Sequence, residues 1–100
     1  PVTARTPGCF VAALGEEAKE QALCLLTTMR RAGIRSEAAL DKTFKVQMRH
    51  AGKSGYPLCA ILGGDEIASG TVTLKDLGSG EQTSVASDLF VHAVKQSLDR

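Results

Sequence analysis

The chain has 100 residues, about the length of one domain, and 43% of them are apolar and 23% charged. This composition is typical of a globular protein, and it excludes a disordered segment, which could not bury enough apolar surface to offset the entropy lost on ordering. No apolar run approaches the roughly 20 residues that cross a bilayer, and the net charge of +1 excludes a basic character spread over the whole chain.

The first elements in chain order are a linker, a strand and a helix. Residues 1–8 are polar with a proline near each end, which is typical of a linker, so we expect one domain over residues 9–100. The short apolar run 9–14 predicts a strand buried on both faces. A helix is predicted from Gly15 to Gly33, with carboxylates in its first turn, arginines in its last, and small and aliphatic residues at helical spacing.

The remaining elements alternate between strands and helices before a hairpin. They are a weaker strand at 34–40, a helix at 41–55, an apolar strand at 58–62, a turn at 63–65, strands at 71–77 and 82–85, and a helix starting at Ser87. Buried strands separated by helices imply parallel pairing, and the hairpin adds an antiparallel edge. The sequence therefore predicts one α/β domain.

Few residues in the sequence could form an active site. The three cysteines, Cys9, Cys24 and Cys59, lie among apolar residues, so we expect buried, reduced thiols and a reducing compartment. No Cys-x-x-Cys motif is present, and no serine or cysteine stands in a nucleophile elbow. His50 and His92 each fall on a predicted helix without a second metal ligand at useful spacing. We therefore predict no catalytic residue and no metal site in this chain.

A local concentration of positive charge lies under the near-neutral total. Between residues 42 and 64 the sequence has no acidic residue, and four basic residues fall three or four positions apart, so they share one face of the helix predicted at 41–55. These residues are Lys42, Lys45, Arg49 and Lys53. Such a ridge can track a phosphate backbone. The alternative is an ordinary solvated helix face.

The hairpin carries a second polar pattern. Thr71, Thr73 and Lys75 alternate along its first strand and are predicted to stand side by side on one face, with Glu66 in the turn before it. A carboxylate accepts hydrogen bonds from base amino or imino groups, whereas lysine and threonine donate to base carbonyls or phosphate oxygens. Unstacked bases of single-stranded RNA expose the edges that such groups read. The alternative is a solvent-facing edge hairpin whose lysine protects against aggregation.

Several segments together resemble the C-terminal anticodon-binding domain of histidyl-tRNA synthetase, a class II aminoacyl-tRNA synthetase. They are ALGEEA (13–18), MRRAGIR (29–35), KVQMRHAGKSG (45–55), ILGGDEIASGTVTLKDL (61–77) and GEQ (80–82). The resemblance covers nearly the whole chain from Cys9 onward. It implies a three-layer sandwich in which a mixed five-stranded sheet is flanked by three helices.

The same resemblance implies a role in translation. The domain would hold the anticodon loop of tRNA(His) while a class II catalytic domain, absent from this chain, uses ATP and Mg to attach histidine to the tRNA. The parent protein would be a cytoplasmic histidine–tRNA ligase, a homodimer with no membrane attachment. By itself this chain would have no catalytic site and no cofactor.

The resemblance also implies roles for individual residues. Positions matching Glu66 and Lys75 contact anticodon bases in related domains, and the loop leading into the second helix, here Asp41 and Lys42, is used as well. We expect base contacts by these groups and by the hairpin threonines, and backbone contacts by the basic helix face. The anticodon set is Glu66, Lys75, Thr73, Thr71 and Lys42, and the RNA backbone set is Lys45, Arg49 and Lys53. The alternative is an accessory or regulatory protein-interaction domain that does not read bases. Val46 on the ridge would suit a protein contact in such a domain. A third interpretation, a free-standing enzyme, has no active site in the sequence to support it.

Overall fold

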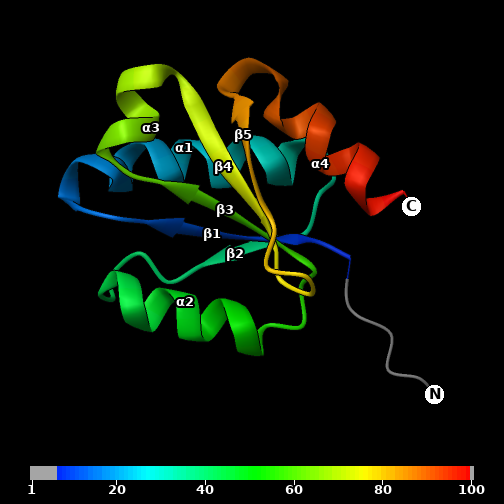
Figure 1. Cartoon of the computed structure of the whole chain (residues 1–100), viewed down its shortest axis with the longest axis horizontal. Helices are drawn as coiled ribbons and strands as arrows, with labels where there is room; N and C mark the ends of the chain where they lie inside the picture. Colours follow the sequence, from blue (N-terminus) through cyan, green and yellow to red (C-terminus); the bar gives the residue numbers. More distant parts are fainter. Residues whose placement is uncertain (1–6, 100) are drawn as a thin grey trace.

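The computed structural model describes residues 7–99, which form an α/β domain around one five-stranded sheet (Figure 1). In chain order the elements are β1 (Cys9–Ala13), α1 (Glu16–Arg31), β2 (Ser36–Ala38), α2 (Phe44–Lys53), β3 (Leu58–Leu62), α3 (Gly64–Ser69), β4 (Thr71–Asp76), β5 (Gln82–Ala86), a 3₁₀ turn (Ser87–Leu89) and α4 (Phe90–Leu98). Most of the linker predicted at 1–8 lies outside the described residues.

The sheet is mixed, as expected, and its strands lie in the order β2-β1-β3-β4-β5. β1 pairs in parallel with both β2 and β3, whereas β4 runs antiparallel to its neighbours β3 and β5. The carboxyl ends of β1, β2 and β3 therefore meet at one edge of the sheet, and β4 starts at that same edge. The loops that lead into α1, α2 and α3 gather there.

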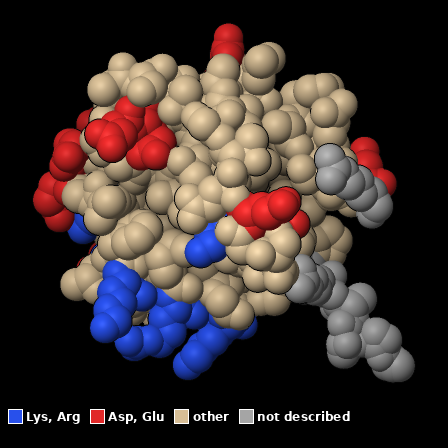
Figure 2. Space-filling view, in the orientation of Figure 1, with Lys and Arg blue, Asp and Glu red and all other residues tan. Residues whose placement is uncertain are grey.

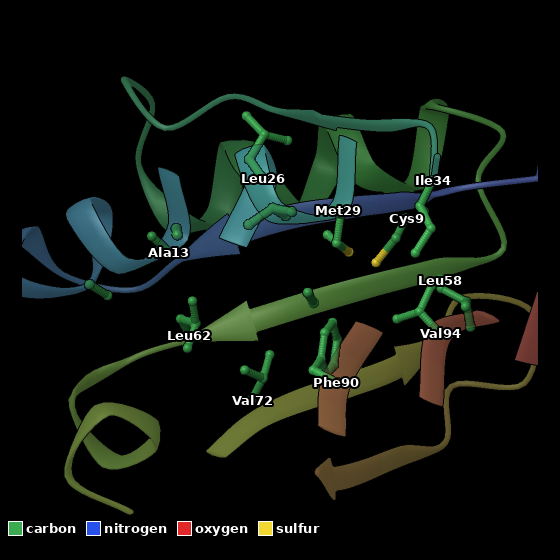
Figure 3. Packing of buried hydrophobic residues seen from close by; sticks show 14 residues of the cluster. Cys9, Ala13, Leu26, Met29, Ile34, Leu58, Leu62, Val72, Phe90 and Val94 are labelled. Atoms are coloured by element: carbon green, nitrogen blue, oxygen red, sulfur yellow. The ribbon is translucent and has the colours of Figure 1, made fainter. Parts of the chain in front are cut away.

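Apolar side chains divide between the two faces of the sheet. The larger cluster fills the face under α1 and α4, where Met29, Phe90 and Val94 pack against Cys9 and Leu58 (Figure 3). With no tryptophan and only three phenylalanines in the chain, aliphatic side chains make up most of this cluster.

The opposite face has a smaller cluster and one helix. Phe10, Ala12 and Cys59 project from β1 and β3 toward α2, which contributes Ala51 and is joined by Tyr56 just after it. α2 lies along the β1 and β2 side of the sheet, away from β4 and β5 (Figure 1). The same face of β4 and β5 is consequently left without a helix in the described part of the chain.

Several predicted boundaries are wrong, each for a local reason. The strand predicted at 34–40 has only three residues. α2 begins at Phe44, not at Asp41, because the Thr43 hydroxyl accepts a hydrogen bond from the Val46 N–H and caps the helix there. α4 begins at Phe90, after the 3₁₀ turn that starts at the predicted Ser87.

The segment predicted as a turn at 63–65 instead opens a fourth helix, α3. This helix ends at Gly70, whose φ of 69° lies in the left-handed region and lets the chain turn directly into β4. The prediction of three helices around the sheet therefore missed one short helix.

The cysteine prediction is confirmed at two positions and wrong at the third. Cys9 and Cys59 are buried and free, whereas Cys24 lies on the exposed side of α1. Burial raises the pKa of the Cys9 thiol, and it raises the pKa of Cys59 to about 12. Both buried thiols are therefore protonated at neutral pH.

Because the thiolate is the reactive form, we expect one fast thiol in the native chain and three after unfolding. A colorimetric thiol assay at pH 8, with and without guanidinium, measures both numbers. Cys24→Ser should remove the fast reaction. A fast reaction that survives this substitution would show that a sheet thiol is accessible.

Candidate functional site

The uncovered part of the sheet carries a row of polar side chains on each of two strands. In the register of β4 and β5, Thr73 lies opposite Ser84 and Lys75 lies opposite Gln82. Paired residues project to the same side, and Thr73 also pairs with Ile61 of β3, which packs against the cluster under α2. These rows are therefore on the α2 side. We call this surface the open sheet face, and its polar residues are Thr71, Thr73, Lys75, Gln82 and Ser84.

The structure confirms that the three predicted β4 residues share one face, and it adds two from β5. Thr71, Thr73 and Lys75 are half-buried, whereas Gln82 and Ser84 are exposed. Sequence reasoning missed the β5 pair because a strand of mostly polar residues shows no alternation that would mark one face. The register supplies this information, since each β5 residue lies directly across from a β4 residue.

Glu66 joins this row through α3. Its carboxylate accepts two hydrogen bonds, one at Oε1 from the Gly63 N–H at 2.9 Å and one at Oε2 from the Thr73 hydroxyl at 2.8 Å. The first bond caps α3, and the second ties the helix to the open sheet face. Glu66 is half-buried and so keeps contact with solvent. The carboxylate is held in one orientation before any ligand binds.

Glu66 and Lys75 lie on the same side of the molecule. Thr73 contacts Glu66, and Lys75 is two residues further along β4, about 7 Å away at the strand rise of about 3.4 Å per residue. Among the described residues no ion pair engages the Lys75 ammonium. Its charge acts on the buried Cys59 thiol, where it opposes the rise in pKa that burial causes. The Glu66 acceptor on α3 is thus followed by hydroxyls and a cation along β4.

The four residues of the predicted ridge do not form one continuous helical face. Lys45, Arg49 and Lys53 are exposed on α2, but Lys42 lies in the loop before the helix, where its ammonium is 3.7 Å from the Asp41 carboxylate. Lysine and arginine side chains gather over α2 in Figure 2, and acidic side chains gather over α3. The predicted concentration of positive charge is therefore present, with its first member displaced into the loop.

Gln47 fixes α2 and the Lys42 loop to the sheet. β1 extends past the end of the short strand β2, so the Ala13 N–H and C=O have no partner strand on that side. The buried Gln47 carboxamide replaces it: Oε1 accepts from the Ala13 N–H at 2.8 Å, and Nε2 donates to the Ala13 carbonyl at 2.9 Å. Nε2 also donates to the Lys42 carbonyl at 2.9 Å. The hydrophobic pattern of the predicted helix gave no sign of this role of Gln47, because a glutamine is not counted among the apolar residues that mark a buried face.

Other features of the described residues are a cavity and two histidines. A cavity of about 270 Å³ lies between α1, α3 and the start of β4, and its wall includes Cys24, Leu25 and Ile67. No group of three histidine, cysteine, aspartate or glutamate side chains in residues 7–99 could hold a metal ion. Within the same residues, no helix combines the length and apolar character needed to cross a bilayer. His50 and His92 are exposed.

Comparison with known proteins identifies the chain's relatives. Residues 8–97 match the family model described as an anticodon binding domain. Histidine–tRNA ligase 2 of Bacillus cereus (strain ATCC 10987) is 40% identical over 91 residues, which is 90% of this chain and 22% of that protein. The crystal structure of histidyl-tRNA synthetase from Nostoc sp. PCC 7120 superimposes with a TM-score of 0.79 at 32% identity, covering 93% of this chain and 23% of that one.

A third comparison supports the fold alone. The RNA binding domain of threonyl-tRNA synthetase from Cryptosporidium parvum superimposes with a TM-score of 0.82, although only 16% of residues are identical. It covers 93% of this chain and 25% of that one. Across these comparisons the chain spans about a quarter or less of each protein that it matches.

The Gln47 contacts lead to a stability prediction. Gln47→Met keeps the side-chain length but leaves the Ala13 N–H and C=O buried without partners, so we expect a loss of about 2 to 4 kcal/mol in the free energy of unfolding. Gln96→Met, at an exposed position of α4, should change it by less than about 0.5 kcal/mol. Urea unfolding of both variants measures the difference. Equal stabilities would contradict the role of the carboxamide.

Proposed function

We propose that this chain, which belongs to the anticodon-binding domain family, binds the anticodon loop of tRNA(His) as the C-terminal domain of a histidine–tRNA ligase. The two relatives above that are more than 30% identical are histidine–tRNA ligases, and the chain corresponds to 22% of the length of the first of them. The observation that carries the proposal is the row formed by Glu66, Thr73 and Lys75 on the open sheet face.

The chemistry of this row suits unstacked bases. The oriented Glu66 carboxylate accepts hydrogen bonds from the imino and amino groups that guanine and uracil present, and the Lys75 ammonium donates to their carbonyl oxygens. Thr71 extends the row on β4, and Gln82 and Ser84 supply amide and hydroxyl groups on β5. Because the Thr73 hydroxyl already donates a hydrogen bond to the Glu66 carboxylate, RNA binding would have to order few side chains on this surface.

Affinity and base discrimination would come from different residues. The exposed cations Lys45, Arg49 and Lys53, with Lys42 in the adjoining loop, neutralise phosphates without reading sequence. The open sheet face contacts base edges and distinguishes one anticodon from another. This division follows the residue sets assigned from the sequence except for Lys42, which moves from the anticodon set to the cations that neutralise phosphates. Both surfaces lie on the α2 side of the sheet.

The activity of the parent protein is part of the same proposal. ATP and Mg would be bound by a catalytic part outside this chain, where histidine is activated and transferred to the tRNA. The names of the relatives support the ligase assignment. A homodimeric parent in the cytoplasm is the remaining part of the proposal. In this arrangement the present chain contributes tRNA selection and no catalytic group.

A binding titration tests the proposed function. An RNA stem-loop that carries the GUG anticodon should bind the chain more tightly than the same stem with a scrambled loop, as measured by fluorescence anisotropy. Equal affinities for the two loops would contradict base reading. That result would favour a protein-interaction domain instead.

Substitutions on the row test the residues that we assign. Lys75→Ala and Glu66→Gln should each weaken binding of the GUG stem-loop about tenfold or more, since a hydrogen bond to a charged group contributes about 1.5 to 3 kcal/mol. Lys95→Ala removes a cation from α4, on the other face of the sheet, and serves as the control. Wild-type affinity in Lys75→Ala would remove that residue from the site.

A further inference from the structure

A cavity of about 450 Å³ lies beside α2, on the side of β2. Arg49, His50, Lys53 and Ser54 line it from α2 and its end, and Phe10 and Glu37 line it from β1 and β2. The Glu37 carboxylate is not free, because its Oε2 accepts a hydrogen bond from the Tyr56 hydroxyl at 3.1 Å. This hydrogen bond leaves the Glu37 carboxylate its negative charge, but Arg49 and Lys53 place two cations against it, so positive charge prevails in the lining of the cavity.

More positive charge acts on this edge of the sheet. The charges of Arg30 and Arg35 reach the Tyr56 hydroxyl, where they oppose the increase in its pKa that burial and Glu37 cause. Arg30 is held in place because its Nε donates to the Ser36 carbonyl at 3.0 Å. The β2 edge therefore combines Arg30 of α1 and Arg35, which directly precedes β2, with the cations of α2.

The cavity and the open sheet face lie on opposite flanks of α2. Around α2 the buried Gln47 points to the sheet, and at about 100° per residue His50 and Met48 fall on opposite flanks. Since His50 lines the β2-side cavity, the Met48 flank faces β3 and the open sheet face, and Lys45 is the cation nearest to that flank. The ridge thus has two parts: Lys45 toward the open sheet face, and Arg49 and Lys53 beside the cavity.

Charge around the open sheet face leaves one approach for a polyanion. Acidic residues lie at both ends of β4, with Asp65 and Glu66 in the first turn of α3 and Asp76 and Glu81 at the hairpin. The β5 edge carries no lysine or arginine in Gln82–Ala86. The α2 side is the basic one (Figure 2). Repulsion at the ends of the strand and attraction over α2 favour a phosphate backbone that crosses the helix.

We infer that the β2-side cavity is a phosphate site for the duplex stem that adjoins a bound loop. The inference rests on the proposed function: with the loop over the open sheet face, the stem crosses α2, and one of its phosphates lies between Arg49 and Lys53. The arginine guanidinium makes paired hydrogen bonds to phosphate oxygens, and the lysine adds a mobile point charge. Lys45 contacts the loop, and the Arg49–Lys53 pair contacts the stem.

Two RNAs separate the contributions of loop and stem. The first is a hairpin with the GUG loop, and the second is the single-stranded loop heptamer alone, both titrated at low salt and then at increasing salt. The double variant Arg49→Gln/Lys53→Gln removes the cavity cations, and Lys45→Gln is the matched control on the other flank. All three positions are exposed, so unfolding midpoints should stay close to wild type.

The double variant should bind the hairpin about tenfold more weakly. Its slope of log affinity against log salt concentration should fall by about one unit per lost phosphate contact. The variant should bind the heptamer as the wild type does. Lys45→Gln should weaken both RNAs. An unchanged hairpin affinity and slope in the double variant, or an equal loss for hairpin and heptamer, would overturn the inference. Discrimination between GUG and scrambled loops by the wild type reports separately on the proposed function, because phosphate contacts carry no sequence information.

Discussion

Within residues 7–99, one face of the sheet carries a single helix, and the location of that helix decides what the rest of the face can do. α2 covers the parallel strands, and the buried Gln47 carboxamide holds it there by pairing with the backbone of Ala13 where β2 has ended. β4 and β5 are stabilised by packing on the other face, through Val72 and the apolar cluster under α1 and α4. Their second face is therefore free to carry polar side chains at little cost to the core.

A near-neutral chain can bind a polyanion when its charges are separated in space. The net charge is +1, yet cations gather on α2 and the β2 edge while carboxylates lie at α3 and the hairpin. One of those carboxylates, Glu66, is held by Gly63 and Thr73 at the end of the open sheet face, where it can serve as an acceptor. Under the proposed function these acidic residues would repel phosphates, and Glu66 alone among them would also accept hydrogen bonds from base N–H groups.

Sequence patterns predicted the main elements because apolar periodicity reports burial directly, as in the run 9–14 and in α1. They also placed Thr71, Thr73 and Lys75 on one face, since alternation along a strand does not depend on its partners. They missed α3 because six residues that begin with a glycine form a helix only through the Glu66 cap and packing. No local pattern encodes the register of the strands or which flank of α2 faces which strand. The register places Gln82 and Ser84 on the open sheet face, and the orientation of α2 places the β2-side cavity.

The most direct test of the central claim follows the backbone amides of the chain by NMR during titration with the GUG stem-loop. Shifts concentrated in β4, β5, α2 and the start of α3, with α4 unchanged, are the result that an open sheet face for anticodon bases predicts. Shifts confined to α1 and α4, with the amides of Thr73 and Lys75 unmoved at saturation, would contradict it.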